Sequence, residues 1–165
     1  MFNIYEATEK DIPAIIQIAE MTWWPTYSSF ISIEQIRYML DSIYSPEAIA
    51  NAIASRSQTF LILSDENAPK GFAAFGVRAD DHKTYKLHKL YVLPETHGKG
   101  YGKKLIEDVK RRVREHQGTR LDLNVNRFNP AKEFYGKMGF TIIKEEDIPI
   151  GPYWMNDFVM QVDIA

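Results

Sequence analysis

The sequence has 165 residues, no cysteine, 25% charged residues and a formal net charge of −2. This length suits one domain with a substantial core, so we expect a single domain over residues 1–165. The near-neutral charge gives no general attraction to nucleic acid. The lack of cysteine excludes a disulfide framework, a cysteine nucleophile and thiolate metal ligands. The four histidines are scattered without metal-binding spacing, so no metal is expected.

Hydropathy along the chain argues against a membrane protein. No apolar run approaches the roughly 18 residues that a membrane-spanning helix needs. The start, Met1 to Glu6, lacks the charged region of a signal peptide. We therefore expect a cytoplasmic protein with neither a membrane nor a nucleic acid as partner.

The first half of the chain predicts a strand, three helices and a β-hairpin. In chain order these are a strand over 2–7, helices over 8–21, 33–43 and 46–54, and hairpin strands over 59–63 and 71–77. Thr8 or Asp11 caps the first helix. The run Trp23-Trp24-Pro25-Thr26-Tyr27 is expected to break that helix after Met21.

The second half of the chain predicts strands that alternate with helices. In order these are a strand over 84–93, a basic amphipathic helix after Gly102, a strand over 119–125, a helix over 130–138 and two strands turning at Gly151-Pro152. Antiparallel strands first and crossover helices later imply a mixed sheet. The fold class is therefore α/β, of the mixed α+β kind.

A glycine-rich segment, His97-Gly98-Lys99-Gly100-Tyr101-Gly102, joins the 84–93 strand to the basic helix. Its three alternating glycines let the backbone turn sharply and approach a ligand closely. The N–H groups and dipole at the helix N-terminus favour an anion such as pyrophosphate. The spacing fits neither a P-loop nor a dinucleotide fingerprint. A plain strand-to-helix turn is the alternative for this segment alone.

The short helix near residue 130 has a clear start, buried face and end. Asn129 is a good N-cap, Pro130 suits the first helical position, and Gly139 ends the helix in the left-handed position. The buried face carries residues at helical spacing, namely Ala131, Phe134, Tyr135 and Met138.

These two segments resemble the GNAT acyltransferase superfamily, whose members move an acyl group from acyl-CoA to an amine. The family's loop pattern, Gln/Arg-x-x-Gly-x-Gly/Ala, matches 97–102, with His97 at its first position. Its later pattern, Asn-x-x-Ala-x-x-Phe-Tyr-x-x-x-Gly-Phe, fits 131–140, but its asparagine falls on Phe128 and Asn129 stands one place later. The 153–160 tail looks like the closing strand of many small-amine acetyltransferases.

The resemblance implies a three-layer fold in which helices flank a central, mostly antiparallel sheet. This sheet would splay where the fourth strand leaves the fifth, making a cofactor cleft. The resemblance also implies acetyl-CoA as cosubstrate, a primary amine such as a small amine or polyamine as acceptor, and a homodimer, since homodimers are common among relatives.

For the cofactor, the resemblance implies two kinds of main-chain contact. Groups around Leu90 and Val92 would pair with the pantetheine arm like an added strand, and the glycine loop would hold the pyrophosphate. The expected cofactor-binding residues are Leu90, Val92, His97, Gly98, Lys99, Gly100, Tyr101, Gly102, Lys103, Asn129 and Lys137. Alternatively, Asn129 only caps its helix and the lysines form a solvated basic face.

Two residues are expected to move protons. Tyr135 matches the position of the family's general acid and would protonate the CoA thiolate; its alternative is a core aromatic. His88 is the candidate base, expected to share a face with Lys86, Leu90 and Val92, on the strand where relatives often carry a glutamate. Its alternative is a strand residue with an exposed ring.

The resemblance implies that the acceptor side lies at the expected break after the first helix. Trp23, Trp24 and Tyr27 would hold a cationic amine by cation–π contact, and Asp157 would add negative charge. Hydrophobic packing is the alternative for the aromatic residues. Two other functions stay open, namely acetylation of a protein N-terminus or lysine, and a non-catalytic acyl-CoA-binding module.

Overall fold

A seven-stranded sheet organises the computed structural model, which describes residues 1–164. The strands are β1 (Phe2–Glu6), β2 (Thr59–Asp65), β3 (Ala68–Val77), β4 (Thr84–Val92), β5 (Arg120–Asn126), β6 (Thr141–Ile150) and β7 (Tyr153–Asp163). Their order across the sheet is β1-β2-β3-β4-β5-β7-β6. Every neighbouring pair is antiparallel except β4 and β5, which are parallel. The predicted mixed, mostly antiparallel sheet is therefore confirmed.

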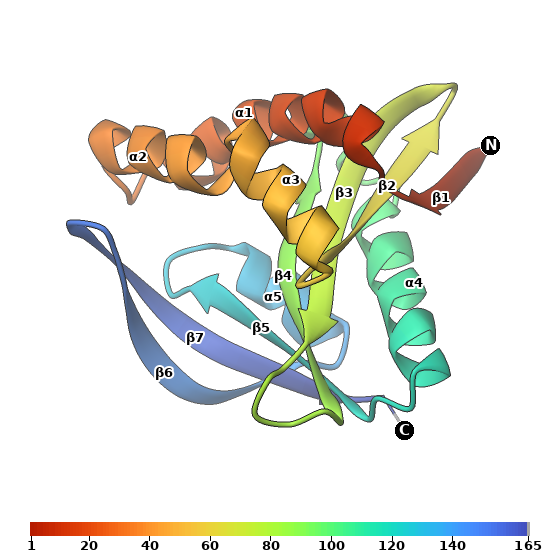
Figure 1. The fold of residues 1–165 in the computed structure, drawn as a ribbon. Coiled ribbons are helices and arrows are strands. Elements are labelled where there is room, and N and C mark those ends of the chain that lie inside the picture. Colours follow the sequence, from red (N-terminus) through yellow and green to blue (C-terminus); the bar gives the residue numbers. More distant parts are fainter. Residues whose placement is uncertain (165) are drawn as a thin grey trace.

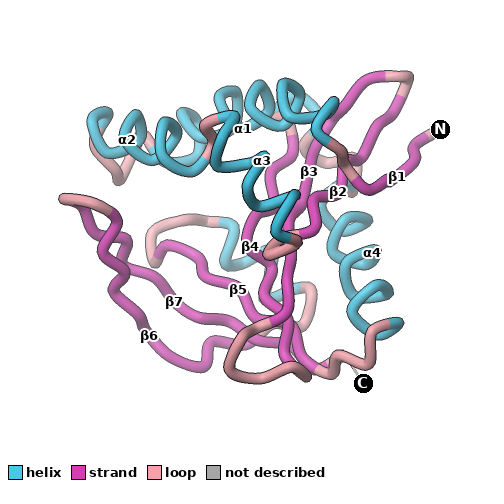
Figure 2. The backbone as a smooth tube through the Cα atoms, in the orientation of Figure 1, coloured by secondary structure: helices cyan, strands magenta, loops and turns pink. Residues whose placement is uncertain are grey.

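Helices cover both faces of the sheet and make the predicted three layers (Figures 1 and 2). One face is covered by α1 (Ile12–Tyr27), α2 (Ile33–Ile43) and α3 (Pro46–Ser55), and the other by α4 (Tyr101–Glu115) and α5 (Ala131–Lys137). Single 3-10 turns precede α1 and α4, at Glu9–Asp11 and Pro94–Thr96. Among residues 1–164, no helix has both the length and the apolar character needed to cross a bilayer.

Two hydrophobic cores lie on the two faces of the sheet. On β2, Phe60 and Ile62 pack under α1 to α3, while Leu61 and Leu63 pack under α4. Successive residues of a strand point to opposite faces, so a strand buried on both faces is apolar at nearly every position. This explains the continuous apolar run Phe60-Leu61-Ile62-Leu63. Packing on both faces holds the sheet between its helices.

The first helix is longer than the sequence predicts. α1 continues through Pro25 to Tyr27, so the expected break at residues 23–27 is wrong. Trp23 and Tyr27 lie on the same buried stripe as Ile15 and Ala19, and both are less than a tenth exposed. Burial of these rings outweighs the one helical hydrogen bond that Pro25 cannot donate.

β4 contains a β-bulge at His88 that the sequence analysis did not predict. Across from β4, Ala74 pairs with Lys89 while the next residue, Phe75, pairs with Leu87, so His88 is the extra residue. The bulge reverses the side-chain alternation. Leu90 therefore packs toward α4, whereas Lys86 lies on the opposite face. The expectation that Lys86, His88, Leu90 and Val92 share one face is thus wrong.

The pairing of β4 with β5 ends just where the bulge begins. The two strands are in register from Thr84 opposite Arg120 to Leu87 opposite Leu123, and beyond that they diverge. β4 continues to Val92 and β5 to Asn126 without a shared ladder. Splaying of the sheet at this place, as the family resemblance implied, is confirmed.

The packing of α4 should dominate the stability of this region. Leu105 of α4 is fully buried against the sheet, so Leu105→Ala should lower the free energy of unfolding by about 2–5 kcal/mol through lost burial and a residual cavity. The control, Ile143→Ala, removes a side chain that is 49% exposed and should change the free energy by less than about 0.5 kcal/mol. Urea unfolding of both variants measures the two changes in the free energy of unfolding. Equal changes would contradict the packing of Leu105 in the core.

Candidate active site

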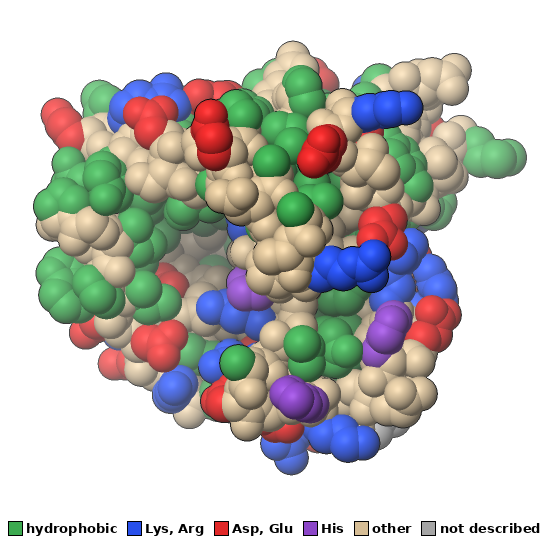
Figure 3. Space-filling view, in the orientation of Figure 1, with side chains coloured by type: hydrophobic (Ala, Val, Ile, Leu, Met, Phe, Trp, Pro, Cys, Tyr) green, Lys and Arg blue, Asp and Glu red, His purple; other side chains and the backbone are tan. Residues whose placement is uncertain are grey.

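A large cavity opens where β4 and β5 diverge. Its volume is about 810 Å³, and its walls come from β4, β5, the 94–102 loop, the first turns of α4 and α5, and the end of α1. The cavity therefore reaches from the α4 side of the sheet to the α1 side. Figure 3 shows the molecule hollowed beneath α2 and α3, with histidine and basic side chains beside the hollow. Six structural elements thus converge on a single space.

Most of the predicted site residues line this cavity. They are Tyr27, His88, Leu90, Val92, His97, Gly98, Gly100, Tyr101, Gly102, Lys103, Asn129 and Tyr135. The structure thus brings the glycine loop, the fourth strand and the short helix together, as predicted, although they are far apart in the sequence.

Five predicted residues lie outside the cavity walls. Lys99 and Lys137 are exposed on the surface. Trp23 is buried in the core against Tyr27, with ring centroids 4.5 Å apart. Trp24 is partly buried against the same core, and its Nε1 donates to Glu20 at 3.2 Å. Neither tryptophan faces the cavity, so their expected contact with an acceptor is wrong, because the helix continues where a loop was expected.

Asp157 is the fifth of these residues, and it lies behind the cavity wall. It is 5% exposed, and Asn124, which lines the cavity, donates to it from Nδ2 at 3.3 Å. Burial raises the pKa of the Asp157 carboxyl, while the Asn124 hydrogen bond and the charge of Lys86 oppose that rise. Its other oxygen, Oδ1, has no hydrogen-bond partner within residues 1–164.

The glycine loop presents backbone N–H groups to the cavity. Gly98 and Gly100 have φ values of +90° and +77°, which L-residues with a Cβ rarely adopt. The first intrahelical bond of α4 is the one from Lys104 N to Gly100 O, at 3.1 Å. The N–H groups of the preceding turn therefore have no helical acceptor, and the positive end of a 15-residue helix lies at the cavity wall. This end can bind an anion.

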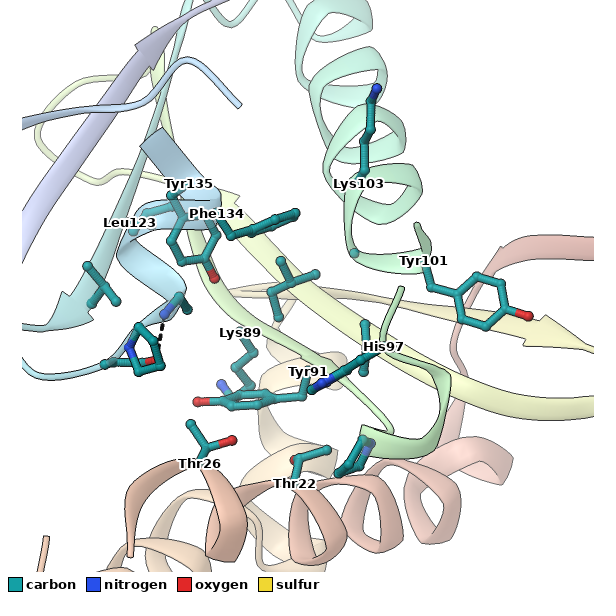
Figure 4. Close-up of a pocket in the computed structure, with 18 of the residues that line it drawn as sticks. Thr22, Thr26, Lys89, Tyr91, His97, Tyr101, Lys103, Leu123, Phe134 and Tyr135 are labelled. Atoms are coloured by element: carbon teal, nitrogen blue, oxygen red, sulfur yellow. Dashed lines mark hydrogen bonds between the residues drawn. The ribbon is translucent and has the colours of Figure 1, made fainter. Parts of the chain in front are cut away.

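Tyr101 is held away from the cavity centre. Its hydroxyl donates to Asp65, and in Figure 4 it points away from the other lining side chains. The hydrogen bond to Asp65 raises the pKa of Tyr101 to about 12. Tyr101 thus fixes the first turn of α4 with its side chain and contributes its backbone to the cavity.

Tyr135 points its hydroxyl into the cavity (Figure 4). Its ring packs between Phe134 and Phe140, with centroids 5.5 and 5.8 Å away. Gly139, with a φ of +98°, ends the helix as predicted, and Phe140 N donates to Tyr135 O at 3.0 Å. Burial raises the pKa of the phenol well above its usual value, so Tyr135 carries its proton at neutral pH.

Asn129 binds the first backbone N–H of α5 and borders the cavity, although Pro130, and not Asn129, stands at the N-cap position. Its Oδ1 accepts from Ala131 N at 2.9 Å, and its side chain is 7% exposed. α5 itself begins at Ala131, slightly later than predicted. The position of Asn129 therefore suits both predicted roles, contact with the cofactor and support of the helix start.

His88 is uncharged at neutral pH. Burial within the cavity wall, then the charges of Lys86, Lys89 and Arg78, lower the pKa of His88 to about 3. The side chain itself is exposed to the cavity, so solvent screens part of this effect. Three cations and no anion act on the ring, so every neighbouring charge favours the neutral imidazole.

Three polar residues on the strands that line the cavity were not singled out from the sequence. Tyr91 and Lys89 come from β4, and Asn124 from β5. The Tyr91 hydroxyl shares a 2.9 Å hydrogen bond with that of Tyr27, which ties β4 to the end of α1. A signal for Lys89 exists in the sequence: the apolar alternation of β4 slips by one residue between Leu87 and Leu90, as a bulge requires.

No metal site accompanies the cavity. In the part of the chain that the structure describes, no group of three His, Cys, Asp or Glu side chains is arranged to hold a metal ion.

Comparisons with known proteins agree with this geometry. The model of the acetyltransferase (GNAT) domain family matches residues 28–151. The spermidine N(1)-acetyltransferase of Thermoplasma acidophilum is 29% identical, over 96% of this chain and 95% of its own. An uncharacterized N-acetyltransferase of Lactobacillus delbrueckii subsp. lactis is 25% identical over the same shares.

Solved structures give the same result for the fold. The PaiA N-acetyltransferase of Thermoplasma acidophilum, in complex with coenzyme A, superposes with a TM-score of 0.84 at 26% identity, covering 99% of both chains. The ribosomal-protein-S18-alanine N-acetyltransferase of Escherichia coli has a TM-score of 0.74 at 18% identity, covering 100% of this chain and 95% of its own.

The chain belongs to the GNAT acetyltransferase family. It is an N-acetyltransferase that uses acetyl-CoA as its cosubstrate.

A substitution at Gly100 tests whether the glycine loop binds CoA. A φ of +77° costs an L-residue about 1–2 kcal/mol, so Gly100→Val should weaken CoA binding by about tenfold or more. The control, Gly136→Ala, adds a Cβ with no atom within 4 Å and should leave binding unchanged. Isothermal titration with CoA measures both. Undiminished binding by a folded Gly100→Val protein would refute the role of the loop.

Proposed function

We propose that the protein acetylates a primary amine by direct attack of that amine on acetyl-CoA, with both substrates bound at once. The observation that carries this proposal is the cavity, which is continuous from the glycine loop to the tip of Tyr135 and on to the α1 side of the sheet. A cofactor and an acceptor can enter such a space from opposite faces and meet between β4 and β5.

At the cofactor end, we propose that the N–H groups from Gly98 to Lys103 hold the pyrophosphate. The helix dipole and the absence of a Cβ at Gly98 and Gly100 support this role. The β4 edge at Leu90 and Val92 faces the gap left by β5, so its backbone groups are free to pair with the amides of the pantetheine arm. Asn129 borders the same arm, while His97, Lys99 and Lys137 stay predicted contacts of the phosphates.

For the proton transfers, we propose Tyr135 as the acid that protonates the departing thiolate. Its raised pKa keeps the proton available, and its hydroxyl faces the cavity. His88 remains a candidate for relaying a proton from the amine through water. Its neutral imidazole has an acceptor nitrogen, although a pKa of about 3 gives it little driving force.

For the acceptor, we propose a small amine or a polyamine. Tyr27 lines the acceptor side, and the buried Asp157 adds negative charge behind Asn124. The likeness to a spermidine acetyltransferase supports the polyamine. A protein N-terminus is the second candidate, because the molecule is hollowed beneath α2 and α3 and this hollow is open to the surface (Figure 3).

A panel of amines separates these acceptors. Spermidine, putrescine, lysine and a short peptide with a free N-terminus are each incubated with the protein and acetyl-CoA, and CoA thiol release is followed. We expect rapid release with spermidine and slow release with the peptide. Faster release with the peptide would favour the protein N-terminus as acceptor, and no release with any of these amines would refute both proposed acceptors.

Removal of the Tyr135 hydroxyl tests the acid. Tyr135→Phe should lower kcat by about 100-fold or more, since it removes a general acid, and should change acetyl-CoA affinity by less than about twofold. Tyr85→Phe, on β4 but outside the cavity, is the control and should retain full activity. Equal losses in kcat and affinity would contradict the acid role.

The cytoplasmic location and the homodimer remain predictions. Sedimentation equilibrium of the purified protein measures the oligomeric state directly.

A further inference from the structure

Lys89 is a cation in a part of the cavity that holds no carboxylate. It is half-buried on the β4 wall, next to the bulge. Its Nζ donates to the neutral side-chain oxygen Oε1 of Gln58 at 2.7 Å. Within residues 1–164, no Asp or Glu forms an ion pair with it. A lysine held this way is not explained by charge pairing.

The surroundings of Lys89 support both of its protonation states. Its Nζ lies 5.4 Å from the ring centroid of Phe60 and 5.9 Å from that of Tyr44, and these π faces stabilise the charged form. Burial, and then repulsion by Lys86, favour the neutral form and lower the pKa of Lys89 to about 8. The titratable and charged groups that face it are Lys86, His88 and Tyr91 of β4 and Tyr44 beyond α2.

The two candidate bases of β4 differ greatly in proton affinity. An alkyl ammonium has a pKa near 10.4, so passing its proton to a base of pKa about 8 is unfavourable by about 250-fold. His88 is the weaker base of the two, because burial and the neighbouring cations lower its pKa further than that of Lys89. At pH 7 about one Lys89 in ten is free base, which is sufficient for catalysis.

We propose that Lys89 is the general base that takes a proton from the acceptor amine at the acyl end of the cavity. This proposal rests on the acetyltransferase function proposed above. Figure 4 supports the placement: Lys89 extends from β4 near α1, and Tyr135 extends into the same cavity from the opposite wall. The base and the acid therefore flank the space between them.

The proton and electron transfers then balance. The neutral Lys89 amine takes one proton from the acceptor ammonium, and the freed nitrogen lone pair forms the C–N bond with the thioester carbonyl carbon. The C–S bond breaks, its electron pair leaves on sulfur, and sulfur takes the Tyr135 proton. The tyrosinate takes the second nitrogen proton, and Lys89 releases its proton to solvent. The charge on Lys89 also favours the negative oxygen of the intermediate.

Lys89→Arg tests this role, because arginine keeps the positive charge and cannot act as a base at neutral pH. We expect kcat/KM at pH 7 to fall by about 100-fold or more, with unchanged acetyl-CoA affinity. The matched control is Lys86→Arg, on the same strand, which keeps the charge that lowers the pKa of Lys89. It should stay within about threefold of the original protein.

The pH dependence distinguishes a base from a structural role. In the original protein kcat/KM should rise with a midpoint near pH 8, as Lys89 loses its proton. In Lys89→Arg it should instead follow the ionisation of the acceptor, and trifluoroethylamine, already free base at pH 7, should be acetylated at nearly the original rate. A variant with a uniform loss at every pH and with every amine would overturn the proposal, as would one with full activity.

A second measurement does not depend on the acceptor. Trace labelling of lysines with acetic anhydride over a pH series, read by mass spectrometry, should give Lys89 a midpoint near pH 8, well below the value of about 10.4 for a lysine model peptide labelled alongside. A midpoint for Lys89 equal to that of a lysine model peptide labelled alongside would overturn the proposal even if no acceptor were acetylated. If the original protein acetylates no amine, the function fails independently of this result.

Discussion

The incomplete pairing of β4 with β5 is the constraint on which the rest of the site depends. The two strands share a ladder only as far as Leu87 and Leu123, and the bulge at His88 turns β4 away from its partner. Backbone groups beyond that point have no strand to pair with, and buried polar groups need partners. The cavity is the consequence. A ligand with amide groups can bind there by pairing with the free backbone groups of the strands.

The electrostatics of this cavity differ from those of a carboxylate-based site. The helix end at Gly100 and the cations of β4 make its walls positive, while the nearest buried acid, Asp157, lies behind Asn124. A positive wall suits the anionic cofactor and a developing oxyanion. It also lowers the pKa of each β4 base through burial and repulsion, so a lysine takes up a base function that a histidine here performs poorly.

Periodicity, caps and glycines predicted the order of the elements and a mixed sheet, because these are local signals. The family resemblance implied the splay of the sheet and the meeting of the glycine loop with Tyr135. The sequence-based predictions failed where tertiary packing decides. Burial of Trp23 and Tyr27 carried α1 through Pro25, and a one-residue bulge reversed the faces of β4. The environment of Lys89 depends on Phe60 of β2 and on Tyr44, just after α2. Both are far from Lys89 in the sequence, so no local pattern reveals them.

Hydrogen exchange of backbone amides, with and without CoA, tests the central claim that the gap between β4 and β5 receives the cofactor. We predict that CoA slows exchange in two segments, Leu90–Val92 and Gly98–Lys103, and leaves the far edge at β1 unchanged. Protection at other surfaces with none in these two segments would contradict the account.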